Sequence, residues 1–282
     1  MTNLRDTMIQ TMTVRNYSPK TIDLYLWAVR GLAYHYMKPP DQLSPKQVQD
    51  YLYYAIQTRN WSWSTVTTVV YGLKYFYYQI LGQPPRQFYL PVPKAAKKLP
   101  VIWSPQEIKC LIREARNPQL KMMIMIAYAS GLRRAEVVRL AVGDIDSKHM
   151  VLWVRGGKGK RDRGALLTRT LLNELRRYWL IQRPPVWLFP RSDGSPRPPK
   201  YFGQQFHEIK NRVAPSKECG PHSLRHSFAT HQYASGADIY TVQKLLGHKS
   251  LSSTIVYIHL AQSILLGRSE SLDLLKTEKI LC

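Results

Sequence analysis

Apolar residues recur at helical spacing through the first 82 residues of the chain. Ser18-Pro19 has the pattern of a helix start, because serine caps the first amide groups and proline fits the first helical position. The apolar residues that follow at spacings of three and four are Ile22, Tyr25, Leu26 and Val29.

A second helix start is the capping box of Ser44 and Gln47. Its helix carries Val48, Tyr51, Leu52 and Ala55. A third helix is expected from about 64 to 81. Region 1–82 therefore predicts a helical domain. Its many tyrosines suit core packing better than stacking on bases, although both uses remain open.

The helical pattern stops between residues 83 and 100, where prolines alternate with basic residues. Such a composition predicts an extended linker that could run along a DNA backbone, with a plain tether as the alternative. The basic residues expected to contact DNA in this stretch are Lys94, Lys97 and Lys98.

Residues 101–282 predict a second domain that mixes helices with a short sheet. A capping box at Ser104 and Glu107 opens it. Strands are expected at 151–154 and 164–167, joined by a turn at 156–163. Helices are expected at 104–116, 118–131, 169–182, 199–213, 222–235, 238–246 and 260–278. The predicted fold is mainly α with a small antiparallel β-sheet.

The charge of the chain points to a polyanionic partner. Lys and Arg total 41 against 18 Asp and Glu, which gives a net charge of +23 and a pI near 10.0. The alternatives are a solubility surplus or a ribosome-like tail. The basic residues are spread through apolar, periodic segments, and this distribution favours a folded domain that binds nucleic acid over one that binds an anionic membrane.

Cysteine usage and hydropathy indicate the cellular compartment in which the protein works. The 3 cysteines are sparse and odd in number, which predicts a reducing environment without a disulfide framework. The first ten residues lack the pattern of a signal peptide, and no apolar run is long enough for a membrane span. We therefore expect a cytoplasmic protein.

Four short segments carry the candidate chemistry. They are residues 129–136 (ASGLRRAE), 156–161 (GGKGKR), 222–226 (HSLRH) and 246–248 (LGH), the last followed by Tyr257. In the third segment His222 and Arg225 stand three residues apart, hence on one helix face. Taken singly, each has an ordinary structural explanation, such as a solvated arginine or a hairpin turn. Residues 156–161 do not match a Walker loop.

A zinc site is an alternative for the third segment. Cys219, His222, His226 and His231 have ligand-like spacing. However, Arg225 lies on the same face as His222 and would repel a cation, and that stretch offers no plausible fourth ligand. The sequence therefore favours no metal at this place.

The ordered set of arginine, lysine, His-x-x-Arg, histidine and tyrosine resembles the signature of the tyrosine recombinases, also called the lambda integrase family. The resemblance covers the whole chain and is most specific at 222–230 (HSLRHSFAT) and 246–259 (LGHKSLSSTIVYIH). These motifs are similar to those of Xer recombinases and integron integrases, but the extra sequence block that marks integron integrases is not evident. The resemblance implies an N-terminal SAM-like core-binding domain and a catalytic domain that together close as a clamp around duplex DNA.

The resemblance also implies a reaction. Tyr257 would attack a DNA phosphate, form a 3′-phosphotyrosyl link and free a 5′-hydroxyl, with no ATP, metal or other cofactor. Arg133 and Arg225 would clamp the nonbridging oxygens. The product would be site-specific recombination of two DNA sites by four protomers.

The remaining candidate residues take supporting roles in that reaction. His222 would accept the tyrosine proton or orient the phosphate, and His248 would donate a hydrogen bond to it. Lys158 matches the position of the general acid, with Lys160 as a rival. Glu136 would support the first arginine. Lys160 and Arg161 are also expected to contact DNA.

Some choices stay open at this level. The tail helix, with Ile264, Leu265, Leu272 and Leu275, could dock on a neighbouring protomer or on its own domain. A type IB topoisomerase uses similar chemistry, although the compact N-terminal helical domain argues against it. A catalytically silent DNA-binding protein would be expected to lack one of the catalytic residues, and every position is filled here.

Overall fold

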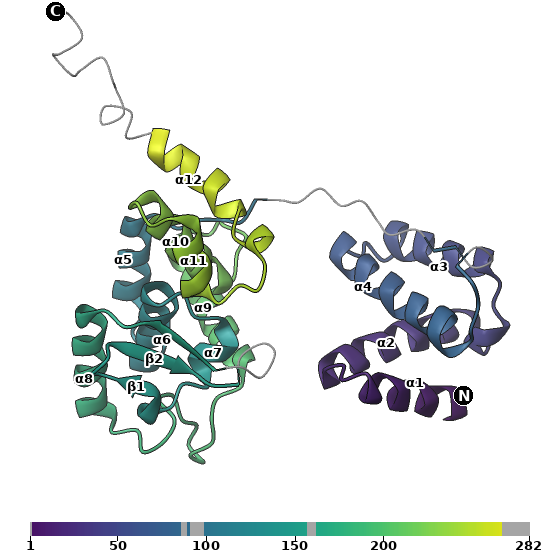
Figure 1. Cartoon of the computed structure of the whole chain (residues 1–282), viewed down its shortest axis with the longest axis horizontal. Coiled ribbons are helices and arrows are strands. Elements are labelled where there is room, and N and C mark those ends of the chain that lie inside the picture. Colours follow the sequence, from purple (N-terminus) through teal and green to yellow (C-terminus); the bar gives the residue numbers. More distant parts are fainter. Residues whose placement is uncertain (1, 86–88, 91–98, 157–161, 267–282) are drawn as a thin grey trace, which may run out of the picture. The chain divides into compact units, whose positions relative to one another are not determined.

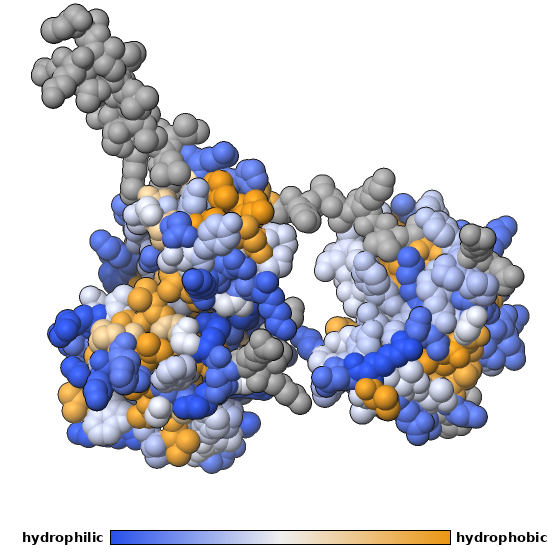
Figure 2. All heavy atoms as spheres, in the orientation of Figure 1, coloured by the Kyte–Doolittle hydropathy of each residue, from blue (hydrophilic) through white to orange (hydrophobic). Residues whose placement is uncertain are grey.

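The computed structural model describes residues 2–85, 89–90, 99–156 and 162–266 of the chain (Figure 1). The chain forms two compact units, Met1–Lys97 and Lys98–Cys282. Each unit has its own apolar core. Figure 2 shows hydrophilic residues spread over the visible face of both units. This distribution agrees with the dispersal of charged residues along the sequence.

The first unit is entirely helical in its described part. Its elements are α1 (Thr2–Val14), α2 (Pro19–Tyr36), the 3₁₀ turn η1 (Pro40–Gln42), α3 (Pro45–Gln57), α4 (Trp63–Lys74) and the π-helical turn η2 (Tyr75–Ile80). The expected caps are present: Ser18 Oγ accepts from the Thr21 amide, and Ser44 and Gln47 form both bonds of a capping box.

Two elements of this unit differ from the expectation. Helix α1 was not expected, because its apolar spacing is weak and its start has no recognisable cap. The helix expected over 64–81 ends as an α-helix at Lys74 and continues as a π turn, in which the Leu81 amide donates to the Phe76 carbonyl five residues earlier. The turn buries Tyr77, whose hydroxyl donates to the Pro40 carbonyl at 2.7 Å.

The tyrosines of this unit serve both the core and the surface. Tyr51 and Tyr75, like Tyr77, are buried in the core. Tyr34, Tyr53 and Tyr71 are exposed. Core packing is therefore confirmed for the first group, and the exposed rings remain available to a partner.

The described part of the second unit contains eight α-helices and a small sheet. The helices are α5 (Pro105–Glu114), α6 (Pro118–Ala129), α7 (Arg134–Val138), α8 (Arg169–Gln182), α9 (Pro199–Val213), α10 (His222–Ala234), α11 (Ile239–Leu246) and α12 (Val256–Leu266), with 3₁₀ turns η3 (Val142–Asp144) and η4 (Leu251–Ser253). Figure 1 shows α10 beside α11, with α12 as the last described element. The expected capping box of Ser104 and Glu107 opens α5.

The sheet has three antiparallel strands in the order β1 (Ile145–Asp146), β2 (Val151–Val154) and β3 (Arg163–Leu166). The two-residue β1 was not expected, because a strand so short leaves no alternation to detect. Residues directly opposite one another in an antiparallel pair point to the same face. Val154 is buried and pairs with Arg163. Arg163 therefore points toward the inside of the unit.

The last described helix also differs from the expectation. A helical stretch was expected from about 260 to 278, with Tyr257 before it. The structure begins α12 at Val256, which places Tyr257 in its first turn. Residues 267–282, which include Leu272 and Leu275, lie outside the described part of the chain, as do the side chains of Ile264 and Leu265.

Candidate functional site

The junction of α6 and α7 presents the first arginine. Gly131 follows α6 with φ +62°, and a Cβ there would lie 2.4 Å from Phe228 of α10. Only glycine combines that backbone conformation with so close an approach. Arg133 then occupies the N-cap of α7 in an extended conformation. Its side chain leaves the helix axis and is partly exposed.

Arg225 on α10 holds two helix ends together. Its side chain is 1% exposed, and its terminal nitrogens donate to the Gly131 and Leu246 carbonyl oxygens at 2.6 Å each. Burial and the charge of Arg133 lower the pKa of Arg225 below its usual 12.5, but the group remains charged at neutral pH. A guanidinium has five N–H donors. Two are used here, so others remain for an anion.

One carboxylate, Glu136 on α7, organises the arginines. It accepts from the Arg133 amide at 2.7 Å, from the Arg133 guanidinium at 2.8 Å and from Arg163 Nη2 at 2.7 Å. Arg225 Nη1 lies 4.0 Å away. Burial alone would raise the Glu136 pKa, but the charge of Arg163 and the hydrogen bonds from Arg133 outweigh it and hold the pKa below its ordinary value.

Arg163 is a site residue that sequence reasoning missed. The turn was expected to extend through residue 163, whereas β3 begins there and directs the side chain inward. Gly247 makes room for it: its φ is +63°, and a Cβ would lie 2.5 Å from Arg163 Cδ. The signal that could have located Arg163 is its register opposite the apolar Val154.

Tyr257 lies inside the site rather than on its surface. It is 2% exposed and packs in a small apolar cluster with Phe228 and Leu246. Its hydroxyl is 3.1 Å from Nδ1 of His226. Burial raises the Tyr257 pKa, and the charges of Arg225 and Arg133 partly offset that increase.

Two histidines contact this tyrosine, and a third contacts one of these two. The His248 ring stacks on Tyr257 with centroids 6.3 Å apart, and its Nδ1 is 3.0 Å from the Thr254 hydroxyl. The His226 ring is tilted against Tyr257 at 5.8 Å. His222 is exposed and touches the His226 ring, with centroids 4.7 Å apart. Burial and nearby positive charge lower the pKa of both His226 and His248 to about 4, so both are neutral at pH 7.

The structure therefore brings together some of the candidate site residues expected from the sequence. Within the second unit it assembles Arg133, Glu136, His222, Arg225, His248 and Tyr257, and it adds Arg163 and His226. The other expected residues lie outside the described part of the chain: Lys94, Lys97, Lys98, Lys158, Lys160 and Arg161.

The zinc alternative finds no support in the described ranges. They contain no group of three or more histidine, cysteine or acidic side chains placed to hold a metal ion. His226 bonds to Tyr257, and His231 bonds to the Tyr128 hydroxyl at 2.9 Å. The described helices also include none long and apolar enough to cross a membrane.

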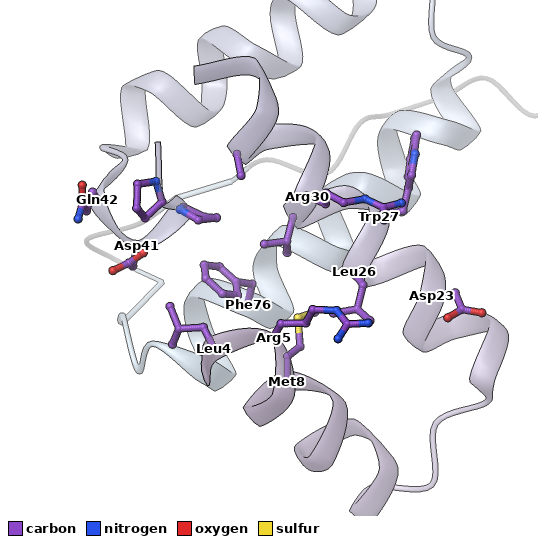
Figure 3. Close-up of a pocket in the computed structure, with 14 residues that line it drawn as sticks. Leu4, Arg5, Met8, Asp23, Leu26, Trp27, Arg30, Asp41, Gln42 and Phe76 are labelled. Atoms are coloured by element: carbon purple, nitrogen blue, oxygen red, sulfur yellow. The ribbon is translucent and has the colours of Figure 1, made fainter. Parts of the chain in front are cut away.

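A separate cavity of roughly 570 Å³ lies in the first unit. Figure 3 shows its mixed lining, in which Leu4, Met8 and Phe76 lie near Arg5 and Asp41. No candidate catalytic residue contributes to it. Within the described residues, the candidate catalytic side chains all lie in the second unit.

Replacing Glu136 with glutamine is expected to destabilise the fold by about 3 kcal/mol at neutral pH, because it leaves neighbouring arginines without a countercharge. A lowered carboxyl pKa stabilises the fold above the unfolded-state value, here 4.5, and that contribution is lost as pH falls through the lowered pKa. The difference in unfolding free energy between wild type and E136Q should therefore shrink between pH 5 and pH 3.

Denaturant unfolding across that pH range measures the difference. Glu174→Gln is the matched control, since Glu174 pairs with an exposed arginine on α8 and its loss should cost less than about 1 kcal/mol. Equal stability of E136Q and wild type at neutral pH would contradict the role given to Glu136.

Comparisons with known proteins agree with this geometry. The sequence profile of the phage integrase family matches residues 103–263, and the profile of the phage integrase N-terminal SAM-like domain matches residues 4–86. A Sinorhizobium fredii protein named as an integrase/recombinase is 37% identical over 278 residues, covering 98% of this chain and 90% of the relative. The tyrosine recombinase XerA of Pyrococcus horikoshii is 32% identical over 236 residues, covering 79% of this chain and 78% of the relative.

A solved structure has a similar fold. The XerH site-specific recombinase, bound to its palindromic difH substrate in a post-cleavage complex, matches with a TM-score of 0.73 at 22% identity. The match covers 90% of this chain and 80% of that chain.

Proposed function

The chain belongs to the phage integrase family and is a tyrosine-type site-specific recombinase acting on DNA, and from this premise we propose that Tyr257 is the nucleophile. The observation that carries the proposal is the position of its hydroxyl. It lies against His226, close enough to Arg225 and Arg133 for their charges to act on its pKa. A phenol in that setting has both a proton acceptor and an electropositive site for a phosphate beside it.

The reaction exchanges one phosphodiester for another. The Tyr257 oxygen attacks the scissile phosphorus, forms a 3′-phosphotyrosyl bond and releases a 5′-hydroxyl. The 5′-hydroxyl of the partner strand then reverses the step. The covalent link preserves the bond energy, so the reaction needs neither ATP nor a metal ion.

Two arginines would stabilise the charge that develops on the nonbridging oxygens. Arg133 is partly exposed, and Arg225 keeps free N–H donors after binding two carbonyls. Fixed donors of this kind need no reorganisation during the reaction. Glu136 holds Arg133 and Arg163 in place, which makes it a positioning residue.

Histidine and lysine side chains would complete the site. His222 is exposed and free to face the phosphate. If His248 Nδ1 accepts from the Thr254 hydroxyl, its proton resides on Nε2 and can be donated to the phosphate. Lys158 would protonate the leaving 5′-oxygen; this assignment rests on the family pattern alone, with Lys160 as its rival.

The burial of Tyr257 implies a step before chemistry. A side chain that is 2% exposed cannot reach a DNA phosphate unless the residues that cover it move aside. DNA binding would supply that shift by bringing an anion to Arg133 and Arg225. We propose that the described arrangement is the state before DNA binds.

The proposed partners are two duplex recombination sites held by four protomers. The XerH complex with difH supports a duplex substrate for that relative. In this chain the two units would close as a clamp on DNA, with Lys94, Lys97, Lys98, Lys160 and Arg161 on the backbone, and the tail helix would dock in cis or in trans. A DNA substrate supports the cytoplasmic location expected for the chain.

A trapping experiment tests the proposal. Nicked duplexes tiled from DNA that flanks the gene should yield a denaturant-resistant adduct, with EDTA present and ATP absent. A label on the strand 5′ of the cleavage point should stay with the protein, because the link is to the 3′-phosphate. An adduct of the opposite polarity, or one that requires a metal ion, would contradict the mechanism.

A further inference from the structure

Two histidines one turn apart on α10 have different surroundings. His222 is exposed, and no hydrogen bond of its side chain is found within the described residues. His226 is half-buried, and its Nδ1 is 3.1 Å from the Tyr257 hydroxyl. The family resemblance implied that His222 either accepts the nucleophile's proton or orients the phosphate. The geometry places a different histidine at the reacting atom.

The direction of this hydrogen bond follows from the chemistry of the two groups. A phenol is a good donor, and an unprotonated imidazole nitrogen is a good acceptor. In neutral His226 the ring proton then resides on Nε2, which leaves the Nδ1 lone pair directed at the Tyr257 hydroxyl. The bond therefore fixes the rotation of the O–H group as well as its position.

We infer that His226 is a catalytic residue, which holds the Tyr257 hydroxyl and accepts its proton during the attack, while His222 acts on the phosphate. The inference rests on the proposed role of Tyr257 as the nucleophile. In the step, the bond from the tyrosine oxygen to phosphorus forms and the bond from phosphorus to the 5′-oxygen breaks. The phenol proton moves to His226 Nδ1, and the 5′-oxygen takes its proton from a separate acid.

The charges around His226 link this role to DNA binding. Burial, together with the nearby charges of His222 and Arg225, lowers its pKa to about 4. A phosphate bound beside Arg225 would supply a negative charge and make the imidazolium easier to form. Without DNA, both partners of the hydrogen bond stay neutral and the nucleophile stays inactive.

The titratable groups near His226 come from four places in the fold. On α10 they are His222 and Arg225, and on α12 Tyr257. The charge of His226 lowers the pKa of His248, which follows α11. The charge of Arg133, which precedes α7, lowers the pKa of both His248 and Tyr257. On α6, Tyr128 pairs instead with His231. The groups facing His226 are therefore positive or neutral, apart from Glu136 behind the arginines.

The test measures single-turnover cleavage of a duplex whose 5′-bridging oxygen is replaced by sulfur. A thiolate leaves without a proton, so the assay isolates activation of the nucleophile. His226→Gln can hydrogen bond but cannot take up a proton, and His226→Ala can do neither. Both should cleave on the order of 100-fold more slowly than wild type at pH 7.

The pH profile separates proton transfer from a structural role. Without His226, Tyr257 must lose its proton to solvent, so the rate should rise about tenfold per pH unit below the tyrosine pKa. The ratio of the wild-type cleavage rate to the variant rate should therefore shrink between pH 6.5 and pH 9.5 for both His226 variants. For His222→Gln the same ratio of rates should stay constant across that range. His207→Gln, at an exposed position on α9, is the matched control and should behave like wild type.

Three results would overturn the inference: cleavage by H226Q and H226A within about threefold of wild type, faster cleavage than wild type, or a deficit that is the same at every pH. Thermal unfolding and DNA binding of each variant show whether the fold is retained, and H226Q serves if H226A does not fold. A wrong assignment of the nucleophile would give a separate result: the covalent protein–DNA adduct would still form in Tyr257→Phe.

Discussion

The covalent protein–DNA adduct and strand exchange are expected to vanish in Tyr257→Phe, while DNA binding stays close to that of wild type. Phenylalanine keeps the ring that packs against Phe228 and Leu246 but lacks the oxygen that attacks phosphorus. Loss of a nucleophile in a covalent mechanism costs at least about 10⁴-fold in rate. The measurement is gel separation of the adduct under denaturing conditions, beside a gel-shift assay for binding.

Tyr240→Phe is the matched control for this prediction. Tyr240 is on α11 of the same unit and is 62% exposed, so its hydroxyl has no part in the site. It should form adduct at the wild-type rate. An adduct that persists in Tyr257→Phe would mean that another residue attacks DNA. Tight binding without an adduct in wild type, on any DNA tested, would favour a silent accessory protein.

The second large effect is expected for Arg225→Lys, which keeps the positive charge and loses the planar fork. Arg225 donates to the Gly131 and Leu246 carbonyl oxygens, and we propose that its remaining N–H groups bind the phosphate. A single ammonium cannot satisfy two carbonyls and a phosphate in the same geometry. Single-turnover cleavage should fall by about 100-fold or more.

The same substitution should also lower the free energy of unfolding. A buried carbonyl left without its donor costs about 1–3 kcal/mol. Denaturant unfolding measures this loss independently of cleavage. Arg139→Lys is the matched control, because Arg139 is an exposed arginine just after α7. Cleavage by R225K within about threefold of wild type would show that charge alone, without the fixed donors, is sufficient.

Local sequence determined the helices that have strong caps, whereas the candidate site residues came from the resemblance of four motifs to the tyrosine recombinases. Ser18, Ser44 and Ser104 cap the helices that their patterns predict, because a cap needs only residues within one turn. Arg133, Arg225, His248 and Tyr257 were proposed because their ordered motifs resemble the signature of that family, and the structure brings these four side chains into one site. Helix caps and short motifs are formed by residues close together in the chain, so they can be read from the sequence directly.

Weak local signals explain the elements that were missed. Helix α1 has no recognisable cap, and β1 is too short for a period. The π turn of Tyr75–Ile80 depends on how Tyr77 reaches the Pro40 carbonyl, a contact that spans 37 residues. In each case the energy that selects the conformation comes from packing against distant residues.

Only the tertiary structure decided how the site is connected. It selected His226 rather than His222 as the hydrogen-bond partner of Tyr257, placed Arg163 on Glu136, and buried Tyr257. His226 and Tyr257 are 31 residues apart, and Arg163 and Glu136 are 27 apart. The physical reason is that hydrogen bonds and ion pairs form within about 4 Å, and the packing of α10, α11 and α12 with β3 determines which side chains come that close.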